Sequence, residues 1–136
     1  MTRLLLKLFF PAVLLILSLF AMRSLFSVPF YTSHDSFTHT ARIAAYFDSL
    51  NDGLASLASG RSGQFPVSWA KNLNGNLGSP IFVYSYPLVY MIGGGMHYLS
   101  VHYEDAFRLI IGVSYILSGF TCYWWLKNRF GAIASQ

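Results

Sequence analysis

Charged side chains are scarce in this sequence. They make up 10% of its 136 residues, whereas soluble domains carry about 25%, and hydrophobic residues make up 54%. This composition excludes an ordinary water-soluble domain. The single cysteine, Cys122, excludes an internal disulfide and a cysteine metal cluster. The nine Lys and Arg residues give a net charge of +4 but form no basic run, so we expect no nucleic-acid partner.

The uncharged residues are gathered into three blocks. Lys, Arg, Asp and Glu are absent from residues 8–22, 72–103 and 109–126. Blocks of this length are typical of membrane-spanning helices. We therefore predict an all-α, multi-pass membrane protein with about three spans and a long extracytoplasmic loop that carries an interfacial helix. Most of the nine Tyr and Trp rings at or after residue 84, a set that includes Tyr90, fall near the ends of the expected spans, where such rings prefer the membrane interface.

These blocks divide the chain into four parts. They are a first transmembrane helix, an extracytoplasmic loop with an amphipathic helix, a transmembrane helical hairpin, and a tail or the start of a further helix: residues 1–30, 31–79, 80–126 and 127–136. In the hairpin, whose second and third spans are expected at about 80–100 and 106–126, Gly93, Gly94 and Gly95 predict a close helix crossing or a kink.

The charges near the amino terminus bear on its location. Arg3 and Lys7 precede the first apolar block and favour an amino terminus on the cytoplasmic side of the plasma (inner) membrane. A basic start and an apolar core also fit a signal peptide, but no small-residue cleavage site follows cleanly, which favours an uncleaved anchor.

The outer loop is expected to begin with a helix over about residues 36–59, with Ser33 or Ser36 as its cap and Gly60 as its end. An apolar stripe at helical spacing would lie on the membrane surface or against the spans. This stripe consists of Phe47, Leu50, Leu54 and Leu57. The stretch from Gly60 to Pro80 is rich in Gly, Asn, Ser and Pro and predicts an irregular loop.

The run SHDSFTHTAR, residues 33–42, carries the strongest chemical signal. Asp35, beside the positive end of the helix and near Arg42, would stay ionised and could accept a proton or coordinate a cation. His34 and His39 add groups that change charge near neutral pH. At 100° per residue, one helix face would carry Asp35, His39, Arg42 and Tyr46. The alternative is that Asp35 only caps the helix, that His39 and Arg42 pair with it, and that this face is merely solvated.

Two longer runs carry a family resemblance. HDSFTHTARIAAYFDSLNDG and GQFPVSWAKNLNGNLGSPIFVYSYPLVYMIGG, in this order, resemble the amino-terminal part of bacterial GT-C membrane glycosyltransferases, most of all the branch of 6-pyruvoyl-tetrahydropterin synthase-related membrane proteins. The resemblance covers about residues 1–130. The matching residues are Asp35, His39, Arg42, Ile43, Phe65, Pro66, Trp69, Asn72, Gly78, Pro80 and Pro87.

The resemblance implies sugar transfer from a polyprenyl-phosphate donor, with Asp35 as the catalytic base in the first outer loop. The supporting or phosphate-facing residues would be His34, His39 and Arg42. Trp69 and Asn72 would shape the acceptor side. The resemblance implies no certain cofactor, and a divalent metal, which Asp35 would bind, is left open.

Members of that superfamily have many more spans than this chain. We therefore expect a truncated piece that is inactive by itself and whose partners are membrane lipids and the polyprenyl-phosphate sugar. The alternative function is that of a small non-enzymatic multi-pass membrane protein with a structural or partner-binding role.

Overall fold

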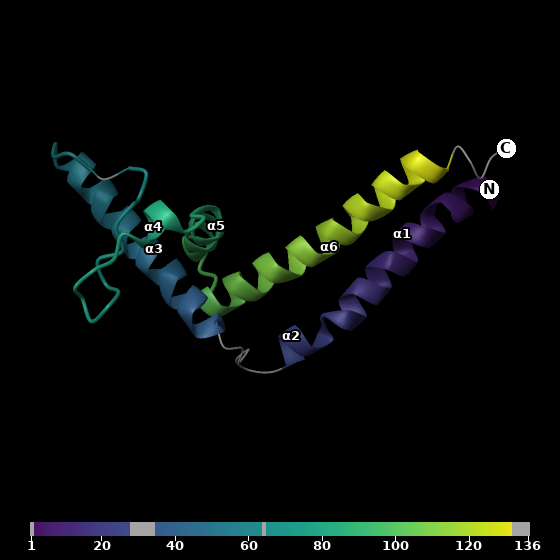
Figure 1. The fold of residues 1–136 in the computed structure, drawn as a ribbon, viewed down its shortest axis with the longest axis horizontal. Coiled ribbons are helices and arrows are strands. Elements are labelled where there is room, and N and C mark those ends of the chain that lie inside the picture. Colours follow the sequence, from purple (N-terminus) through teal and green to yellow (C-terminus); the bar gives the residue numbers. More distant parts are fainter. Residues whose placement is uncertain (1, 28–34, 64, 132–136) are drawn as a thin grey trace. The chain divides into compact units, whose positions relative to one another are not determined.

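The structure is a computed structural model that describes residues 2–27, 35–63 and 65–131. These residues form helices and loops without a β-strand, which confirms the predicted all-α fold (Figure 1). The chain divides into two compact units, unit 1 (Met1–Pro29 and Ile111–Gln136) and unit 2 (Phe30–Ile110). In chain order the helices are α1 (Thr2–Ala21), α2 (Arg23–Ser27), α3 (Ser36–Ala58), α4 (Ile81–Tyr84), α5 (Leu88–His97) and α6 (Tyr103–Phe130).

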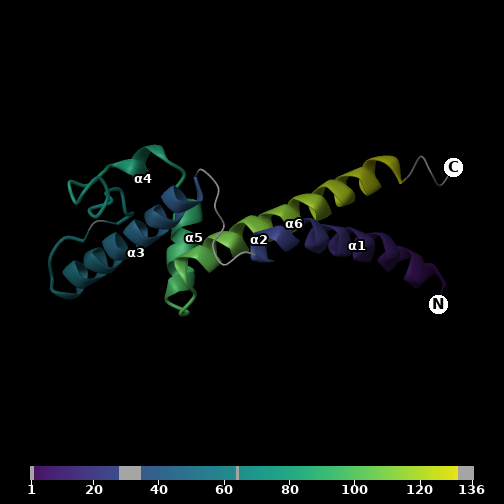
Figure 2. The same ribbon diagram turned by 90° about the horizontal axis from the view of Figure 1, so that it is seen from below.

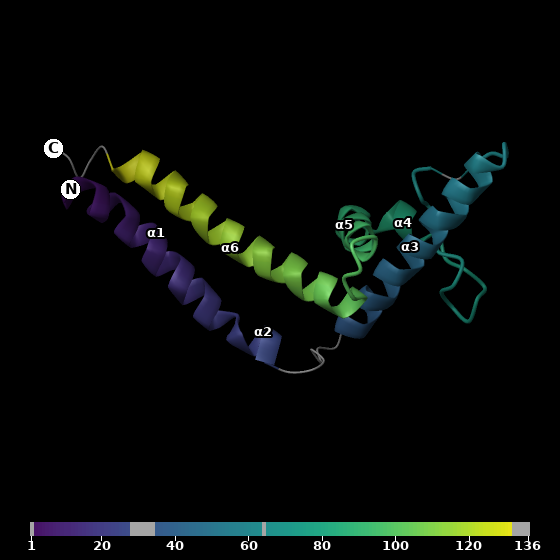
Figure 3. The ribbon, with the colours of Figure 1, turned by 180° about the vertical axis from the view of Figure 1, so that it is seen from behind.

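Unit 1 consists of α1, α2 and the part of α6 that follows residue 110. Gly119 of α6 packs against Leu14. Gly112, near the start of the part of α6 that belongs to unit 1, packs against Met22. Because the later α6 residue meets Leu14 of α1 and the earlier one meets Met22, which directly follows α1, the two helices are antiparallel. Figures 1 and 3 show them side by side.

Helix α6 is long and apolar enough to cross a membrane. Its 28 residues span about 42 Å, more than the roughly 30 Å of a hydrocarbon core. Within the residues that the structure describes, no other helix passes this test, since the apolar helical stretch Phe9–Ala21 of α1 is shorter. The third expected span is thus present as a helix of sufficient length, and multi-pass insertion stays a prediction.

The expected second span, at about 80–100, is not one helix, so that prediction was wrong. α4 has only four residues, the backbone at Ser85 is extended, and α5 starts after Pro87. Pro87 has no N–H to continue a helix but fits the start of one. The ten residues of α5 reach only about 15 Å, half the thickness of a hydrocarbon core.

Unit 2 is built around the crossing of α3 and α5, which Figure 2 shows. Ile43 of α3 is fully buried, and a Cβ atom at Gly93 would lie 2.9 Å from its Cδ1 and Cγ2 atoms. At Gly94 a Cβ atom would be 3.5 Å from the ring of Tyr46. At Gly95, no side chain or backbone atom of the described residues lies within 4 Å of such a Cβ atom. The predicted close crossing is therefore confirmed for the first two glycines.

Helix α3 lies close to where the sequence predicts it. It begins at Ser36, with Asp35 in the N-cap position, and Gly60 follows its end with φ +75°, a conformation that favours glycine. The prediction of Ser36 as the cap was wrong, because Ser36 is the first residue of the helix, and Ser33 lies outside the described residues.

The core of unit 2 gathers around the first half of α3 and includes two residues of the following loop. It consists of Ile43, Ala45, Tyr46, Val67, Ala70, Phe82 and Tyr90. Only half of the predicted apolar stripe is covered. Phe47 packs on the rings of His97 and Tyr103, whereas Leu54 and Leu57 remain about half exposed.

Candidate functional site

The start of α3 holds the residues expected to carry chemistry. Asp35 occupies the N-cap position, and its carbonyl oxygen accepts a hydrogen bond of 2.9 Å from the backbone N–H of His39. Arg42 follows His39 by three residues and therefore lies on the same side of the helix. His34 lies outside the described residues.

The hydroxyl group of Tyr90 joins two of these residues. Arg42 Nη1 donates a hydrogen bond of 3.2 Å to this oxygen, and His39 Nδ1 lies 3.1 Å from it. Since arginine can only donate, the hydroxyl proton is available to the ring nitrogen of His39. We call these three residues the Tyr90 cluster.

Ring contacts fix the Tyr90 cluster in place. The imidazole of His39 is nearly parallel to the ring of Tyr90, with centroids 6.0 Å apart, and to that of Phe107, with centroids 5.4 Å apart. Tyr90 itself is only 3% exposed. A buried hydroxyl needs its hydrogen bonds, so the positions of the His39 and Arg42 side chains are coupled to the packing of α5.

Sequence reasoning missed Tyr90, because it grouped this ring with the aromatic residues of the expected spans and gave it no binding role. A helical pattern could have found it: Tyr90, Gly93, Gly94 and His97 recur at the spacing of one helix face. In the structure all four contact α3.

Tyr46 corrects the expectation of a chemical or solvated face. It is 2% exposed, and its ring meets that of Phe82 edge to face at 5.0 Å. Burial raises the pKa of its hydroxyl above the ordinary value. The α3 face that was predicted to be polar packs against α5, and Tyr46 is part of the core of unit 2.

The two residues expected on the acceptor side belong to the loop after α3, and Asn72 contacts a later part of that helix than Asp35. Asn72 donates a hydrogen bond of 2.7 Å to Asp48, and Trp69 packs against Gly78. Asp48 follows Asp35 by thirteen residues, which is about 20 Å of helix. The structure therefore does not bring Trp69 and Asn72 together with Asp35 at a single point.

Comparisons of the chain with protein-family models, with curated proteins and with solved structures find no match. Among the described residues, no group of three or more His, Cys, Asp or Glu side chains could hold a metal ion.

Proposed function

We propose that this chain is the amino-terminal module of an integral membrane glycosyltransferase-like protein of the GT-C type, which transfers a sugar from a polyprenyl-phosphate donor. The observation that carries the proposal is the Tyr90 cluster. It joins the side chains of His39 and Arg42, which lie within two helical turns of Asp35 along α3.

Each residue at the start of α3 has a part in this reaction. The acceptor hydroxyl oxygen bonds to the anomeric carbon of the donor, the bond from that carbon to the phosphate oxygen breaks, and Asp35 takes the hydroxyl proton. Polyprenyl phosphate leaves with the negative charge. The guanidinium of Arg42 stabilises that charge, because it offers further N–H donors besides the one bound to Tyr90. The positive end of α3 acts in the same direction.

The proposal places the protein in the plasma (inner) membrane as a multi-pass chain with a cytoplasmic amino terminus. Large apolar side chains of unit 1 support a lipid environment, since Phe20 is 71% and Trp124 67% exposed. Trp69 and Asn72 lie far from Asp35, so in this proposal they would contact a part of an extended acceptor that is remote from the reacting hydroxyl.

Replacing Asp35 tests the proposed base. Asn also suits an N-cap position, so Asp35→Asn removes the proton acceptor with little effect on α3. Membranes that contain the protein in its full-length context are incubated with radiolabelled polyprenyl-phosphate sugars, and the label that leaves the lipid fraction is measured. We expect the variant to release label about 10²- to 10⁴-fold more slowly.

The matched control is Asp105→Asn, which removes a carboxylate that pairs with Arg108 at the start of α6. It should release label as fast as the wild type. Full activity of Asp35→Asn, or equal release from membranes without the protein, would contradict the proposal.

A further inference from the structure

Helix α5 has one face that packs on α3 and an opposite face that does not. The residues that contact α3 are Tyr90, Gly93, Gly94 and His97. At 100° per residue, the opposite face consists of Leu88, Met91, Ile92 and Gly95. We call these four residues the outer face of α5. Its three large apolar side chains are each about half exposed, so the outer face has no partner within the described part of the chain that would cover it.

The segments on either side of α5 have the same apolar character. Four of their large side chains are more than half exposed, namely Val83, Tyr84, Tyr86 and Leu99. Lys, Arg, Asp and Glu are absent from residues 72–103. A surface that docks another protein has a polar rim. Exposed Tyr rings next to apolar side chains, without charges, suit the boundary between water and hydrocarbon.

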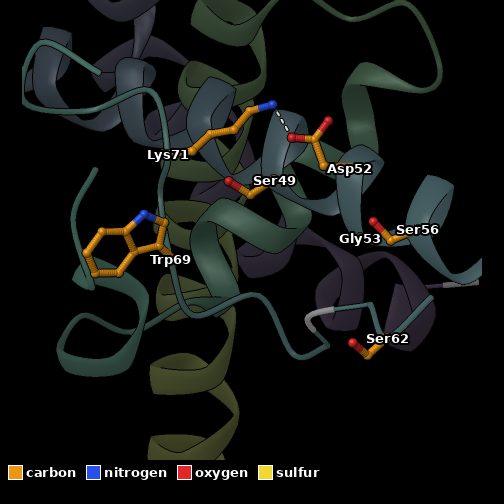
Figure 4. A pocket seen from close by; sticks show the side chains of 7 residues that line it. All are labelled: Ser49, Asp52, Gly53, Ser56, Ser62, Trp69 and Lys71. Carbon is orange, nitrogen blue, oxygen red and sulfur yellow. Dashed lines mark hydrogen bonds and ion pairs between the residues drawn. The ribbon is translucent and has the colours of Figure 1, made fainter. Parts of the chain in front are cut away.

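The charged groups of the loop after α3 lie away from α5. Ile43 of α3 packs against Gly93, and Asp52 follows Ile43 by nine residues, a rotation of about 180° around the helix. Figure 4 shows the ion pair of Asp52 with Lys71 in a pocket of about 200 Å³ that Trp69 also lines. Both charged side chains are about half exposed and therefore need water. Water on this side of α3 is compatible with lipid at the outer face of α5.

The packing of α5 on α3 prevents α5 from entering a membrane end-on. Its ten residues reach only about 15 Å, half the thickness of a hydrocarbon core. Through the contacts at Gly93 and Gly94, α5 would also draw α3 into the hydrocarbon, with Arg42 and Asp48. Charged side chains are costly there. A helix that lies parallel to the membrane surface instead immerses only one face.

The direction of the helices in unit 1 independently limits the number of crossings. Since α1 and α6 are antiparallel, the first turns of α1 and the last turns of α6 lie at the same end of unit 1 (Figure 3). If both helices cross the membrane, an even number of crossings must separate them, so α5 does not cross. The four basic residues of these turns, which then share the cytoplasmic side as the positive-inside rule requires, are Arg3, Lys7, Lys127 and Arg129.

We propose that α5 lies along the extracytoplasmic surface of the lipid bilayer, with its outer face immersed in lipid. The chain then crosses the membrane twice, through α1 and α6, and the last turn of α6 is on the cytoplasmic side. Only residues 98–102 separate α5 from α6, so the chain keeps α5 near the point where α6 enters the membrane. This inference rests on the membrane location in the proposed function, and it does not depend on the transfer reaction.

Thiol labelling in membrane vesicles tests the number of crossings. Cys122→Ser removes the one native thiol, and Arg61→Cys or Asn128→Cys then places a single thiol in the loop after α3 or near the end of α6. Right-side-out and inverted vesicles are treated with a maleimide that does not cross membranes. We expect Arg61→Cys to react only in right-side-out vesicles and Asn128→Cys only in inverted ones. Reaction of both variants in the same vesicles would mean that α5 crosses, and would overturn the proposal.

Spin labels measure the depth of the outer face. In the Cys122→Ser background, a nitroxide is attached to Met91→Cys in lipid nanodiscs, and its accessibility to oxygen is compared with that to a water-soluble nickel chelate. We expect a depth of about 5–10 Å. Two controls fix the scale. Leu117→Cys, exposed near the middle of α6, should lie about 15 Å deep, half the thickness of the hydrocarbon, and Arg61→Cys should be in water.

Three readings of the Met91 label would overturn the proposal. They are a position in water like that of Arg61→Cys, a depth equal to that of Leu117→Cys, and shielding from both reagents, which would mean that protein covers the outer face. Ile92→Cys, on the same face, provides a second reading. Asp35→Asn should change neither the labelling nor the depth. Loss of sugar transfer with both patterns intact would therefore contradict only the transfer reaction, and transfer with both thiols on one side only the placement of α5.

Discussion

Gly93→Leu is expected to lower the free energy of unfolding of unit 2 by about 1–3 kcal/mol or more. Even a Cβ atom at this position would lie 2.9–3.0 Å from three side-chain atoms of Ile43. Ile43 is fully buried, so it has no space into which to move. Helices α3 and α5 must then separate, and their separation disrupts the core around Tyr46 and Tyr90.

Gly95→Leu is the matched control for this change. It adds the same side chain to the same helix, but a Cβ atom at Gly95 meets no atom within 4 Å in the part of the chain that the structure describes. Since Leu favours helix more than Gly, this variant should be as stable as the wild type or slightly more stable. Thermal unfolding in detergent, followed by near-ultraviolet circular dichroism, measures both. Equal stability of the two variants would show that the crossing is looser than described.

Tyr90→Phe is expected to lower the free energy of unfolding by about 1–3 kcal/mol, although it removes a single oxygen atom. That oxygen is the partner of both Arg42 Nη1 and His39 Nδ1. Without it, two polar groups in a partly buried region lose their hydrogen bond. Because the aromatic ring remains, the loss of stability measures the contribution of the hydroxyl group and not that of ring packing.

The control for this change is Tyr84→Phe. The side chain of Tyr84 is 84% exposed, so removal of its hydroxyl should leave stability unchanged. Urea unfolding of both variants in the same detergent gives the comparison. If Tyr90→Phe unfolds at the same urea concentration as Tyr84→Phe, the Tyr90 cluster does not contribute to the fold.

Local sequence patterns predicted the elements that depend on local physics. Helix α3 and its end at Gly60 follow from helical periodicity and from the freedom of glycine to adopt positive φ. The close approach at Gly93 follows from the small size of its side chain. The second span was mispredicted because hydropathy alone does not show that Pro87 starts a new, short helix.

The candidate site was predictable only in part. The positions of His39 and Arg42 on one side of α3 followed from their spacing. Their partner Tyr90 lies about fifty residues away, and the pairing of Asn72 with Asp48 also joins distant segments. Such contacts depend on how the loop and α5 pack on α3, which periodicity does not determine. The pocket around Trp69 arises from the same packing.

The phosphorus NMR signal of decaprenyl phosphate, added to the protein in lipid nanodiscs, tests whether the start of α3 binds the donor phosphate. We expect the wild-type protein to shift or broaden this signal in a saturable way and Arg42→Gln to abolish the effect. Arg61→Gln, which removes an exposed arginine of the loop after α3, should behave as the wild type does. If Arg42→Gln and the wild type give the same titration, or if neither perturbs the signal, the start of α3 does not bind the donor phosphate.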